Sequence, residues 1–338
     1  KQTEAPKTVQ TIQTQTTQTQ TQTTQPKPTE EPKPTTPSIA PSSSVSQSST
    51  RPSTSQVSQS TSGASNSDQF LVINEKWRIN FEDLEFDELV SAGSAGEVYL
   101  GYFFGTPVAI KKLYAVPPDQ KHLVAREFSL LTDVNHPNIV QFLGICDHTS
   151  GIYLITEYVE HGDLFDLLVF GSEDIGWKNK VRIALQIAQA VYYLHSKNII
   201  HRDLKSQNVL IGEANKVKLC DLGLATIMES RQKRMTVCGT NEWMAPEIGI
   251  ADHYDSKVDV FSFGIVLVEL ISNKPPSKRT IQERFAFNVK AFQALVPPTC
   301  PPEFAQLVID CTVYDPAQRP TFKEIVPRLR NLASSLDD

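Results

Sequence analysis

The chain has 338 residues, of which 40% are hydrophobic, and it carries a formal net charge of −6 at pH 7. This length allows two ordinary domains or one large one, and the hydrophobic share is normal for a globular protein. The negative balance argues against a nucleic-acid-binding protein, which would normally present a basic face.

Residues 1–68 differ in composition from the rest of the chain. They are nearly all Gln, Thr, Ser and Pro, and they carry five basic against four acidic residues. Such a segment cannot bury enough apolar surface to offset its chain entropy. We therefore expect a disordered Gln/Thr/Ser/Pro-rich segment over residues 1–76, followed by a compact part.

Cysteine usage and hydropathy bear on the cellular compartment. The number of cysteines is odd, five, and no C-x-x-C pair occurs, which favours a reduced intracellular protein. The longest apolar run, VFSFGIVLVELI from Val260, is too short for a membrane span and contains Glu269. No signal peptide is visible. We expect a cytoplasmic location and leave open a membrane tether on a part that precedes Lys1.

Alternating apolar and polar residues between positions 84 and 113 predict three short strands. The stretches LEFDELV, EVYLGYF and PVAIKKL are separated by turns that contain glycine, so we expect an antiparallel meander. Residues 119–134 then have helical spacing and end before the His136–Pro137 pair. Two more strand candidates follow, NIVQFLGICD and IYLITEYV.

Beyond His161 the pattern becomes helical. Residues 178–196 place apolar side chains along one stripe, which is typical of a helix that faces a core. Residues 256–272 are strongly apolar and predict a central helix, and residues 301–335 predict further helices. A small β-rich part before a larger helical part predicts an α+β chain with two lobes and a cleft, where ligand sites are common.

The segment SAGSAGEV, from Ser91 to Val98, joins the first two predicted strands. Glycine lets a backbone approach a phosphate closely and present its N–H groups. A plain hairpin turn is the commoner explanation of two glycines. No G-K-[ST] follows, so neither a P-loop nor a dinucleotide fold is supported.

Lys111 lies in the apolar stretch VAIKKL. Strand alternation places Lys111 on the same face as Ala109, and Ile110 on the opposite face. Lysine is rarely buried unless it is paired, and Glu127 on the following helix could supply the anion. A surface lysine at a strand end is the alternative.

The loop HRDLKSQN is more specific. Asp203 and Asn208 are five residues apart, so a carboxylate and an amide could face the same small volume. Asp203 could accept a hydroxyl proton, and Asn208 could offer its oxygen to a hard cation. Asp221 follows at the end of the apolar stretch KLCD, and Asp and Asn oxygens together suit Mg²⁺. A structural loop with a self-satisfied Asp203 is the alternative.

The segment CGTNEWMAPE contains Glu247, which follows apolar residues and is a candidate for a buried ion pair. Arg319, in DPAQRPTF, is the expected partner. Because an uncompensated buried charge is costly, exchange of either residue should destabilise the helical lobe.

In this order, SAGSAGEV, VAIK, HRDLKSQN, DLG and APE resemble the motifs of the protein kinase family, over about residues 79–333. The resemblance implies a protein kinase domain over residues 77–338. Its small antiparallel β lobe with one helix would span about residues 79–156, and its larger helical lobe about residues 160–333.

The resemblance also implies roles for two lysines and their neighbours. Lys111 would hold the α- and β-phosphates of ATP and pair with Glu127. Asp203 would act as the catalytic base, while Lys205 would touch the γ-phosphate and steady the transferring group.

Asn208 and Asp221 are the implied ligands of Mg²⁺, with Mn²⁺ as the alternative ion. The chain departs from the family pattern at two nearby positions. Ser91 stands where the first glycine of the loop is usual, and Leu222 replaces the usual phenylalanine after Asp221. Neither departure removes a catalytic group, so an active enzyme is expected.

The stretch ITEYVEHGD resembles the hinge that takes the adenine of ATP through backbone groups of Glu157 and Val159. Thr156 would be the gatekeeper, and Asp163 sits where kinases often bind the ribose. The residues implied in nucleotide binding are Ser91, Ala92, Gly93, Ser94, Ala95, Gly96, Val98, Ala109, Lys111, Thr156, Glu157, Val159, Asp163, Leu210 and Asp221.

The implied activity is transfer of the γ-phosphoryl group of ATP to Ser or Thr hydroxyls of protein substrates. Lys205 and Ser206 stand where tyrosine kinases usually have Ala and Arg. GTNEWMAPE resembles Ser/Thr kinases of the tyrosine-kinase-like group, which includes the Raf and mixed-lineage enzymes. A dual-specificity or tyrosine kinase and a low-activity kinase-like scaffold are the alternatives. No nucleic acid is expected as a partner, and the oligomeric state stays open.

The segment between Asp221 and Glu247 offers sites for regulation. Arg202 could pair with an added phosphate there and order the loop. We predict activation by phosphorylation at Thr236, with ordinary loop hydroxyls as the alternative. The hydroxyl residues considered are Thr226, Ser230, Thr236 and Thr240.

Overall fold

The computed structural model describes residues 74–93, 96–114, 116, 124–125, 128–129, 131–172, 174–222, 242–249 and 254–337. The chain divides into two units, residues 1–61 and 62–338, and every described residue belongs to the second. Residues 1–73, Glu127 and the four hydroxyl residues considered for phosphorylation lie outside the described residues. The expectations that fall on them stay predictions.

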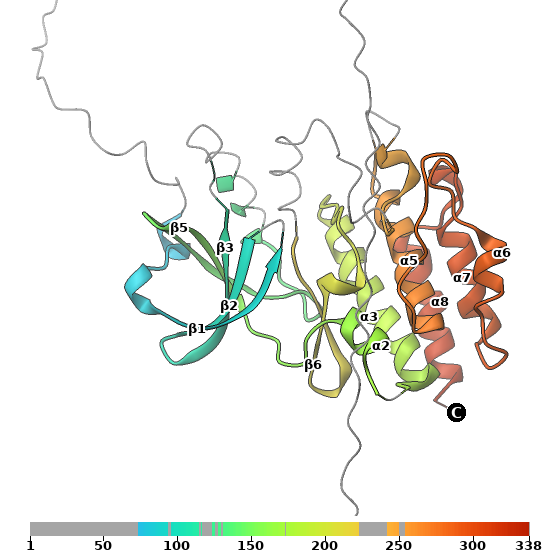
Figure 1. Cartoon of the computed structure of the whole chain (residues 1–338), viewed down its shortest axis with the longest axis horizontal. Helices are drawn as coiled ribbons and strands as arrows, with labels where there is room; N and C mark the ends of the chain where they lie inside the picture. The colour runs from blue at the N-terminus through green and yellow to red at the C-terminus, as the bar shows by residue number, and fades with distance from the viewer. Residues whose placement is uncertain are drawn as a thin grey trace, which may run out of the picture. The chain divides into compact units, whose positions relative to one another are not determined.

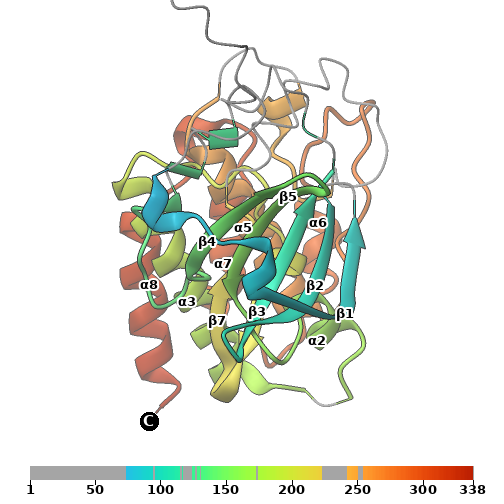
Figure 2. The same ribbon diagram turned by 90° about the vertical axis from the view of Figure 1, so that its left-hand side faces the viewer.

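Five strands form one antiparallel sheet with the strand order β1-β2-β3-β5-β4. They are β1 (Leu84–Gly93), β2 (Gly96–Phe103), β3 (Thr106–Leu113), β4 (Phe142–His148) and β5 (Gly151–Glu157). Figure 2 shows this sheet facing the viewer, with β1 at its right-hand edge. The predicted meander is confirmed, because β1, β2 and β3 are consecutive antiparallel neighbours.

Strand alternation divides the apolar side chains of this sheet between two clusters. Tyr153 and Ile155 of β5 belong to one cluster, whereas Leu154 belongs to the other. Lys111 of β3 is the register partner of Leu154. Ala109 lies two residues before it and therefore shares its face of the sheet, as the alternation predicted.

An N-terminal segment, residues 75–83, packs on β4 ahead of the first predicted strand. It contains two short 3₁₀ turns, Glu75–Trp77 and Phe81–Asp83. Its backbone follows β4, and the N–H of Ile79 donates to the carbonyl of Ile145 at 2.9 Å. The Trp77 ring lies 5.2 Å from the ring of Phe142, measured between centroids. This segment is therefore part of the folded unit.

The rest of the described chain is mainly helical (Figure 1). Its helices are α2 (Leu164–Val169), α3 (Gly176–Ser196), α5 (Lys257–Ser272), α6 (Val289–Gln293), α7 (Pro302–Cys311) and α8 (Phe322–Ser335). A two-stranded antiparallel sheet consists of β6 (Val209–Gly212) and β7 (Lys216–Leu219). Further 3₁₀ turns are Ser206–Asn208, Glu213–Asn215, Pro246–Gly249 and Pro316–Gln318.

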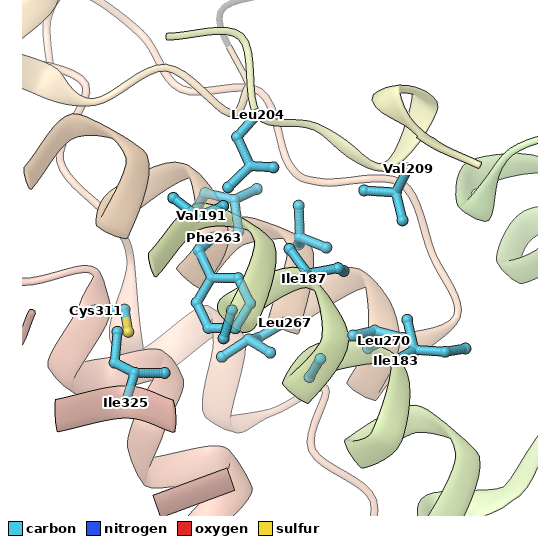
Figure 3. Close-up of a cluster of buried hydrophobic side chains, with 14 of the residues drawn as sticks. Ile183, Ile187, Val191, Leu204, Val209, Phe263, Leu267, Leu270, Cys311 and Ile325 are labelled. Atoms are coloured by element: carbon cyan, nitrogen blue, oxygen red, sulfur yellow. The ribbon is translucent and has the colours of Figure 1, made fainter. Parts of the chain in front are cut away.

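Helix α5 is the centre of the helical part. Every residue from Val258 to Ile271 is buried, which confirms the predicted central helix. Helices α3 and α7 both pack on α5 and on α8. Figure 3 shows this core, with side chains of α5 facing those of α3 and, from the loop above, Leu204. Within the described ranges, no helix has both the length and the apolar character needed to cross a bilayer.

The helical prediction for residues 301–335 holds for two separate helices, α7 and α8. Between them the Asp315 carboxylate caps the turn Pro316–Gln318, and Thr321 with Glu324 forms a capping box that starts α8. Arg319 lies in this break and is only 2% exposed. Its guanidinium donates to both carboxylate oxygens of Glu247, at 2.5 and 2.9 Å, so the predicted ion pair is confirmed.

Candidate active site

A cavity of about 620 Å³ is lined by residues of both the five-stranded sheet and the helical part. Fourteen of the predicted site residues contribute to its walls, although they come from points across the whole folded unit. These are Ser91, Ala92, Gly93, Val98, Ala109, Lys111, Thr156, Glu157, Val159, Asp163, Lys205, Asn208, Leu210 and Asp221.

Among the predicted site residues that the structure describes, two do not belong to this lining. Asp203 and Gly96 are described but are not wall residues of the cavity. Ser94, Ala95 and Glu127 lie outside the described residues. The predicted Lys111–Glu127 pair therefore stays a prediction.

Lys111 reaches the cavity from the middle of β3, between β2 and β5 in the sheet. Its side chain is buried, and its Nζ lies 2.6 Å from Oδ1 of Asp221. Asp221 comes two residues after β7 and has a φ of 58°, a conformation that non-glycine residues rarely adopt. The ion pair thus joins the sheet to the chain just beyond β7.

The loop of Asp203 holds its polar groups in one network. The Asn208 amide nitrogen donates to the backbone oxygen of Asp203 at 2.7 Å and to its Oδ2 at 3.0 Å. The Nζ of Lys205 lies 3.0 Å from the same Oδ2. Asp203 therefore contacts two residues of the cavity wall, and its side chain is 42% exposed, so the carboxylate is accessible from solvent.

Two kinds of anchor fix this loop on the helical part. Leu204 and Val209 insert into the apolar core between α3 and α5 (Figure 3). The carboxylate of Asp259, at the start of α5, accepts from the backbone N–H groups of His201 and Arg202, both at 2.8 Å. Lys205, Gln207 and Asn208 lie between Leu204 and Val209 in the sequence, and all three line the cavity.

Glu157 lies where the sheet continues into the helical part. Its backbone N–H donates to the carbonyl of Gln141 at 3.0 Å, and its carboxylate accepts from the Gln141 N–H at 2.7 Å. The same carboxylate forms an ion pair with Lys218 of β7 at 2.5 Å. The cavity-lining residues Thr156 and Val159 flank this fixed position.

Two cavity residues have shifted proton affinities. Burial raises the pKa of the Asp163 carboxyl, and the N–H of Asp166, which donates to it at 2.9 Å, opposes that shift. Burial also raises the pKa of the Cys220 thiol well above its usual value, and the negative charge of Asp221 adds to this effect. Cys220 is therefore a neutral thiol beside the ion pair.

The residues present fit a magnesium ion that is held jointly with a phosphate ligand. Because the amide nitrogen of Asn208 donates to Asp203, the amide oxygen is the atom of Asn208 that could hold a cation. The Asp221 carboxylate lines the same cavity. One carboxylate and one amide are few ligands, which is how Mg²⁺ is commonly bound when substrate phosphates supply the others.

Part of the apolar wall of the cavity was not identified as a binding surface from the sequence. Leu154 and Leu219 come from strands, and Leu222 follows Asp221. The alternation within β5 is the sequence pattern that could have identified Leu154, because Leu154 lies two residues before Thr156 and so on the same face of the sheet. The remaining apolar wall residues include Leu131, Val134, Val140 and Phe142.

Comparison with known proteins matches residues 84–329 to the family described as protein tyrosine and serine/threonine kinase. A probable serine/threonine-protein kinase of Dictyostelium discoideum is 48% identical over 265 residues, which is 78% of this chain and 44% of the relative. A RasGEF domain-containing serine/threonine-protein kinase of the same organism is 42% identical over 267 residues, 77% of this chain and 28% of the relative. The chain thus spans less than half the length of these two relatives.

Proposed function

The chain belongs to the protein tyrosine and serine/threonine kinase family, and from this premise we propose that it transfers the γ-phosphoryl group of ATP to Ser or Thr hydroxyls of protein substrates. One observation carries the proposal. Lys111, Asn208 and Asp221 line a single cavity, and the carboxylate of Asp203 accepts a hydrogen bond from Asn208. An ammonium, a metal-binding pair and a carboxylate base are what phosphoryl transfer from ATP requires.

Each residue has a distinct part in the proposed reaction. Lys111 binds α- and β-phosphate oxygens through its ammonium, and Glu127 is its proposed second partner. Asp203 accepts the proton of the substrate hydroxyl. The hydroxyl oxygen forms a bond to the γ-phosphorus, while the bond between that phosphorus and the leaving oxygen of ADP breaks. Lys205, 3.0 Å from Asp203, offsets the negative charge of the transferring group.

Asn208 and Asp221 are the proposed ligands of Mg²⁺, with Mn²⁺ as the alternative. A bound ion would supply positive charge that stabilises the negative charge of the transferring phosphoryl group. For the adenosine part, we propose backbone groups of Glu157 and Val159 and the carboxyl of Asp163. The raised pKa of Asp163 does not prevent a hydrogen bond to a ribose hydroxyl, because a neutral carboxyl both donates and accepts.

Ser or Thr is the proposed acceptor, because the relatives are named serine/threonine-protein kinases and Lys205 lies beside Asp203. Dual specificity and tyrosine specificity are the alternatives, as is a low-activity scaffold. The finer assignments are also proposals. They are the tyrosine-kinase-like group, a kinase domain over residues 77–338, activation at Thr236, and a cytoplasmic location, which the free thiols of Cys146, Cys220, Cys300 and Cys311 support.

The experiment is ATP turnover by the purified chain on a generic protein substrate and on matched peptides that carry Ser, Thr or Tyr as the single acceptor. We expect phosphate transfer to Ser and Thr peptides, dependence on added Mg²⁺, and loss of activity with a chelator that Mg²⁺ reverses. Absence of transfer to all three peptides, with nucleotide bound, would favour the scaffold. Transfer to the Tyr peptide alone would overturn the acceptor assignment.

A further inference from the structure

Glu269 is an ionisable residue in the middle of the most apolar helix of the chain. Its side chain is 0% exposed, and the neighbouring residues of α5 are buried apolar side chains. Within the described part of the chain, its polar contacts are two hydrogen bonds, and no basic side chain pairs with it. A buried carboxylate is costly unless hydrogen bonds compensate for the lost water.

The two hydrogen bonds come from segments that are far apart in the sequence. The hydroxyl of Ser206 donates to Oε1 of Glu269 at 2.7 Å, and the indole N–H of Trp243 donates to Oε2 at 2.7 Å. Ser206 lies two residues before Asn208, in the loop of Asp203. One carboxylate thus joins this loop to the segment that contains Trp243.

The Trp243 segment is itself fixed to the helical part. The carbonyl of Trp243 accepts from the hydroxyl of Ser262 at 2.9 Å. Glu247, four residues later, is held by the buried guanidinium of Arg319. The position of Trp243 is therefore fixed independently of its hydrogen bond to Glu269.

Helix α5 presents three polar side chains to these segments, at spacings of three and seven residues, which places them on one side of the helix. Asp259 holds the backbone of residues 201–202, and Ser262 holds the backbone of Trp243. Glu269 holds Ser206 at the other end of the loop. The loop is thus attached to α5 near both ends, with Leu204 buried between them.

We propose that Glu269 is a positioning residue for phosphoryl transfer, because its carboxylate sets the position of the Asp203–Asn208 loop against the fixed Trp243 segment. The inference rests on the proposed kinase function. Glu269 acts through Ser206 and touches no reacting atom. A catalytic loop displaced by about 1 Å can lose about a hundredfold in rate, so a single buried anchor can have a large kinetic effect.

Donor and acceptor chemistry supplies matched variants. Indole N–H can only donate, whereas a serine hydroxyl can donate or accept. In Glu269→Gln the amide oxygen accepts from Trp243, and the amide N–H₂ donates to Ser206. Both bridges are therefore retained without the charge. In Glu269→Met a side chain of similar length remains, but the bridges are lost.

The first measurement is steady-state kinetics of these two variants beside the wild type and Leu267→Ala, a core truncation on the same helix (Figure 3). We expect Glu269→Met to lower kcat by about ten- to a hundredfold with the KM for ATP within about twofold. Glu269→Gln should restore most of kcat. Leu267→Ala should lower the melting temperature but keep kcat per folded molecule. Equal kcat losses in Glu269→Met and Leu267→Ala would overturn the inference.

A double-mutant cycle tests the bridge itself. Ser206→Ala and Trp243→Phe each remove one donor, and within the described residues no hydrogen bond joins Ser206 to Trp243 directly. If Glu269 connects them, the two losses in kcat should be less than multiplicative. The coupling should vanish in the Glu269→Met background. Multiplicative losses in the wild-type background would contradict the bridge.

Amide hydrogen exchange gives a readout that needs no activity. Exchange over residues 201–208 should rise in Glu269→Met, stay near the wild-type rate in Glu269→Gln, and stay unchanged in Leu267→Ala. If the wild type transfers no phosphate, the proposed function fails on its own and exchange still decides whether Glu269 holds the loop. Unchanged exchange in Glu269→Met would reject the positioning role whatever the activity.

Discussion

The five-stranded sheet and the helical part position their polar side chains by different means. Lys111 stands on a central strand, so its place follows from strand register and from the apolar clusters of the sheet. Asp203 and Asn208 stand on a loop, whose place follows from buried polar anchors on α5. The backbone pairing of the strands does not depend on one side chain. Removal of a polar anchor, in contrast, leaves its buried partners without a hydrogen bond. We therefore expect variants in the sheet to change ligand binding, and variants at the buried anchors of the helical part to change stability as well.

The largest expected effect is a fall in kcat when the proposed catalytic base is replaced. Asp203→Asn removes the proposed base but keeps the size of the side chain, so kcat should fall by about a hundred- to ten-thousandfold. The melting temperature should stay close to that of the wild type, because the side chain is 42% exposed. Phosphate transfer and thermal unfolding measured on the same preparation test this, and a variant with wild-type kcat would remove Asp203 from the mechanism.

The two parts can be compared directly by replacing one buried cation in each with methionine and measuring the loss of stability. Arg319→Met leaves the Glu247 carboxylate, which is only 14% exposed, without its cation and should destabilise the chain by about 3–5 kcal/mol. Lys111→Met also removes a buried cation, but its partner Asp221 is 37% exposed and can be hydrated, so the loss of stability should be about 1 kcal/mol or less.

Denaturant unfolding and nucleotide titration of these two variants provide the measurement. Lys111→Met should weaken ATP binding, and Arg319→Met should bind ATP normally while it is folded. Equal losses of stability in the two variants would show that removal of a buried cation costs the same in the sheet and in the helical part.

The pH dependence of stability should carry a signature of Glu269. Burial raises its pKa from 4.5 to about 7, although the hydrogen bonds from Trp243 and Ser206 oppose the shift. The folded state therefore holds this proton more tightly than the unfolded state. Its contribution to stability is complete below pH 4.5 and is lost as the pH rises through 7.

Glu269→Gln removes this titration, so the variant should match the wild type near pH 5. Near pH 8 it should be more stable, by about 3 kcal/mol at most. Unfolding curves of both proteins between pH 5 and 8 give the difference directly. A constant difference over this range would mean that Glu269 does not titrate there.

A smaller effect is expected at the contact between β4 and the N-terminal segment. A Cβ at Gly144 would lie 2.5 Å from Cδ1 of Ile79 and 2.8 Å from the backbone oxygen of Trp77. Gly144→Ala should therefore cost about 1–3 kcal/mol through overpacking. Gly212→Ala is the control, because its Cβ would meet its neighbours at an ordinary 3.6 Å.

If the clash with Ile79 is the cause, Gly144→Ala combined with Ile79→Ala should lose less stability than the sum of the two single losses. Chemical unfolding of the four proteins supplies the values. An additive result would place the strain elsewhere, for example at the Trp77 backbone.

Much of the fold followed from periodicity. The meander of β1, β2 and β3 and the central helix α5 have strong period-2 or continuous apolar patterns, and both are present in the structure. The N-terminal segment carried no such pattern, because Ile79 lies between two short 3₁₀ turns and Phe81 begins the second, and both contact residues of β4, Ile145 and His148. Local spacing indicates an element, but not a segment that is held by distant neighbours.

The candidate site shows the same division. Asp203, Asn208 and Asp221 were chosen from the sequence because their residue types and spacing resemble kinase motifs. Nothing in the spacing pointed to Ser206 or Trp243 as partners of Glu269, which the sequence marked only as a charge in an apolar run. The spacing also gave no indication that Lys111 pairs with Asp221, although the Nζ of Lys111 lies 2.6 Å from Oδ1 of Asp221.

The sequence indicated the meander of β1, β2 and β3, the apolar helix α5 and the residues that have the chemistry for phosphoryl transfer, because these depend on residue type and short-range spacing. The tertiary structure alone decided which buried charges meet and which loop each anchor holds. These pairings form between segments tens to more than a hundred residues apart, as for Lys111 and Asp221. Only the packing of the whole unit brings such groups within hydrogen-bonding distance.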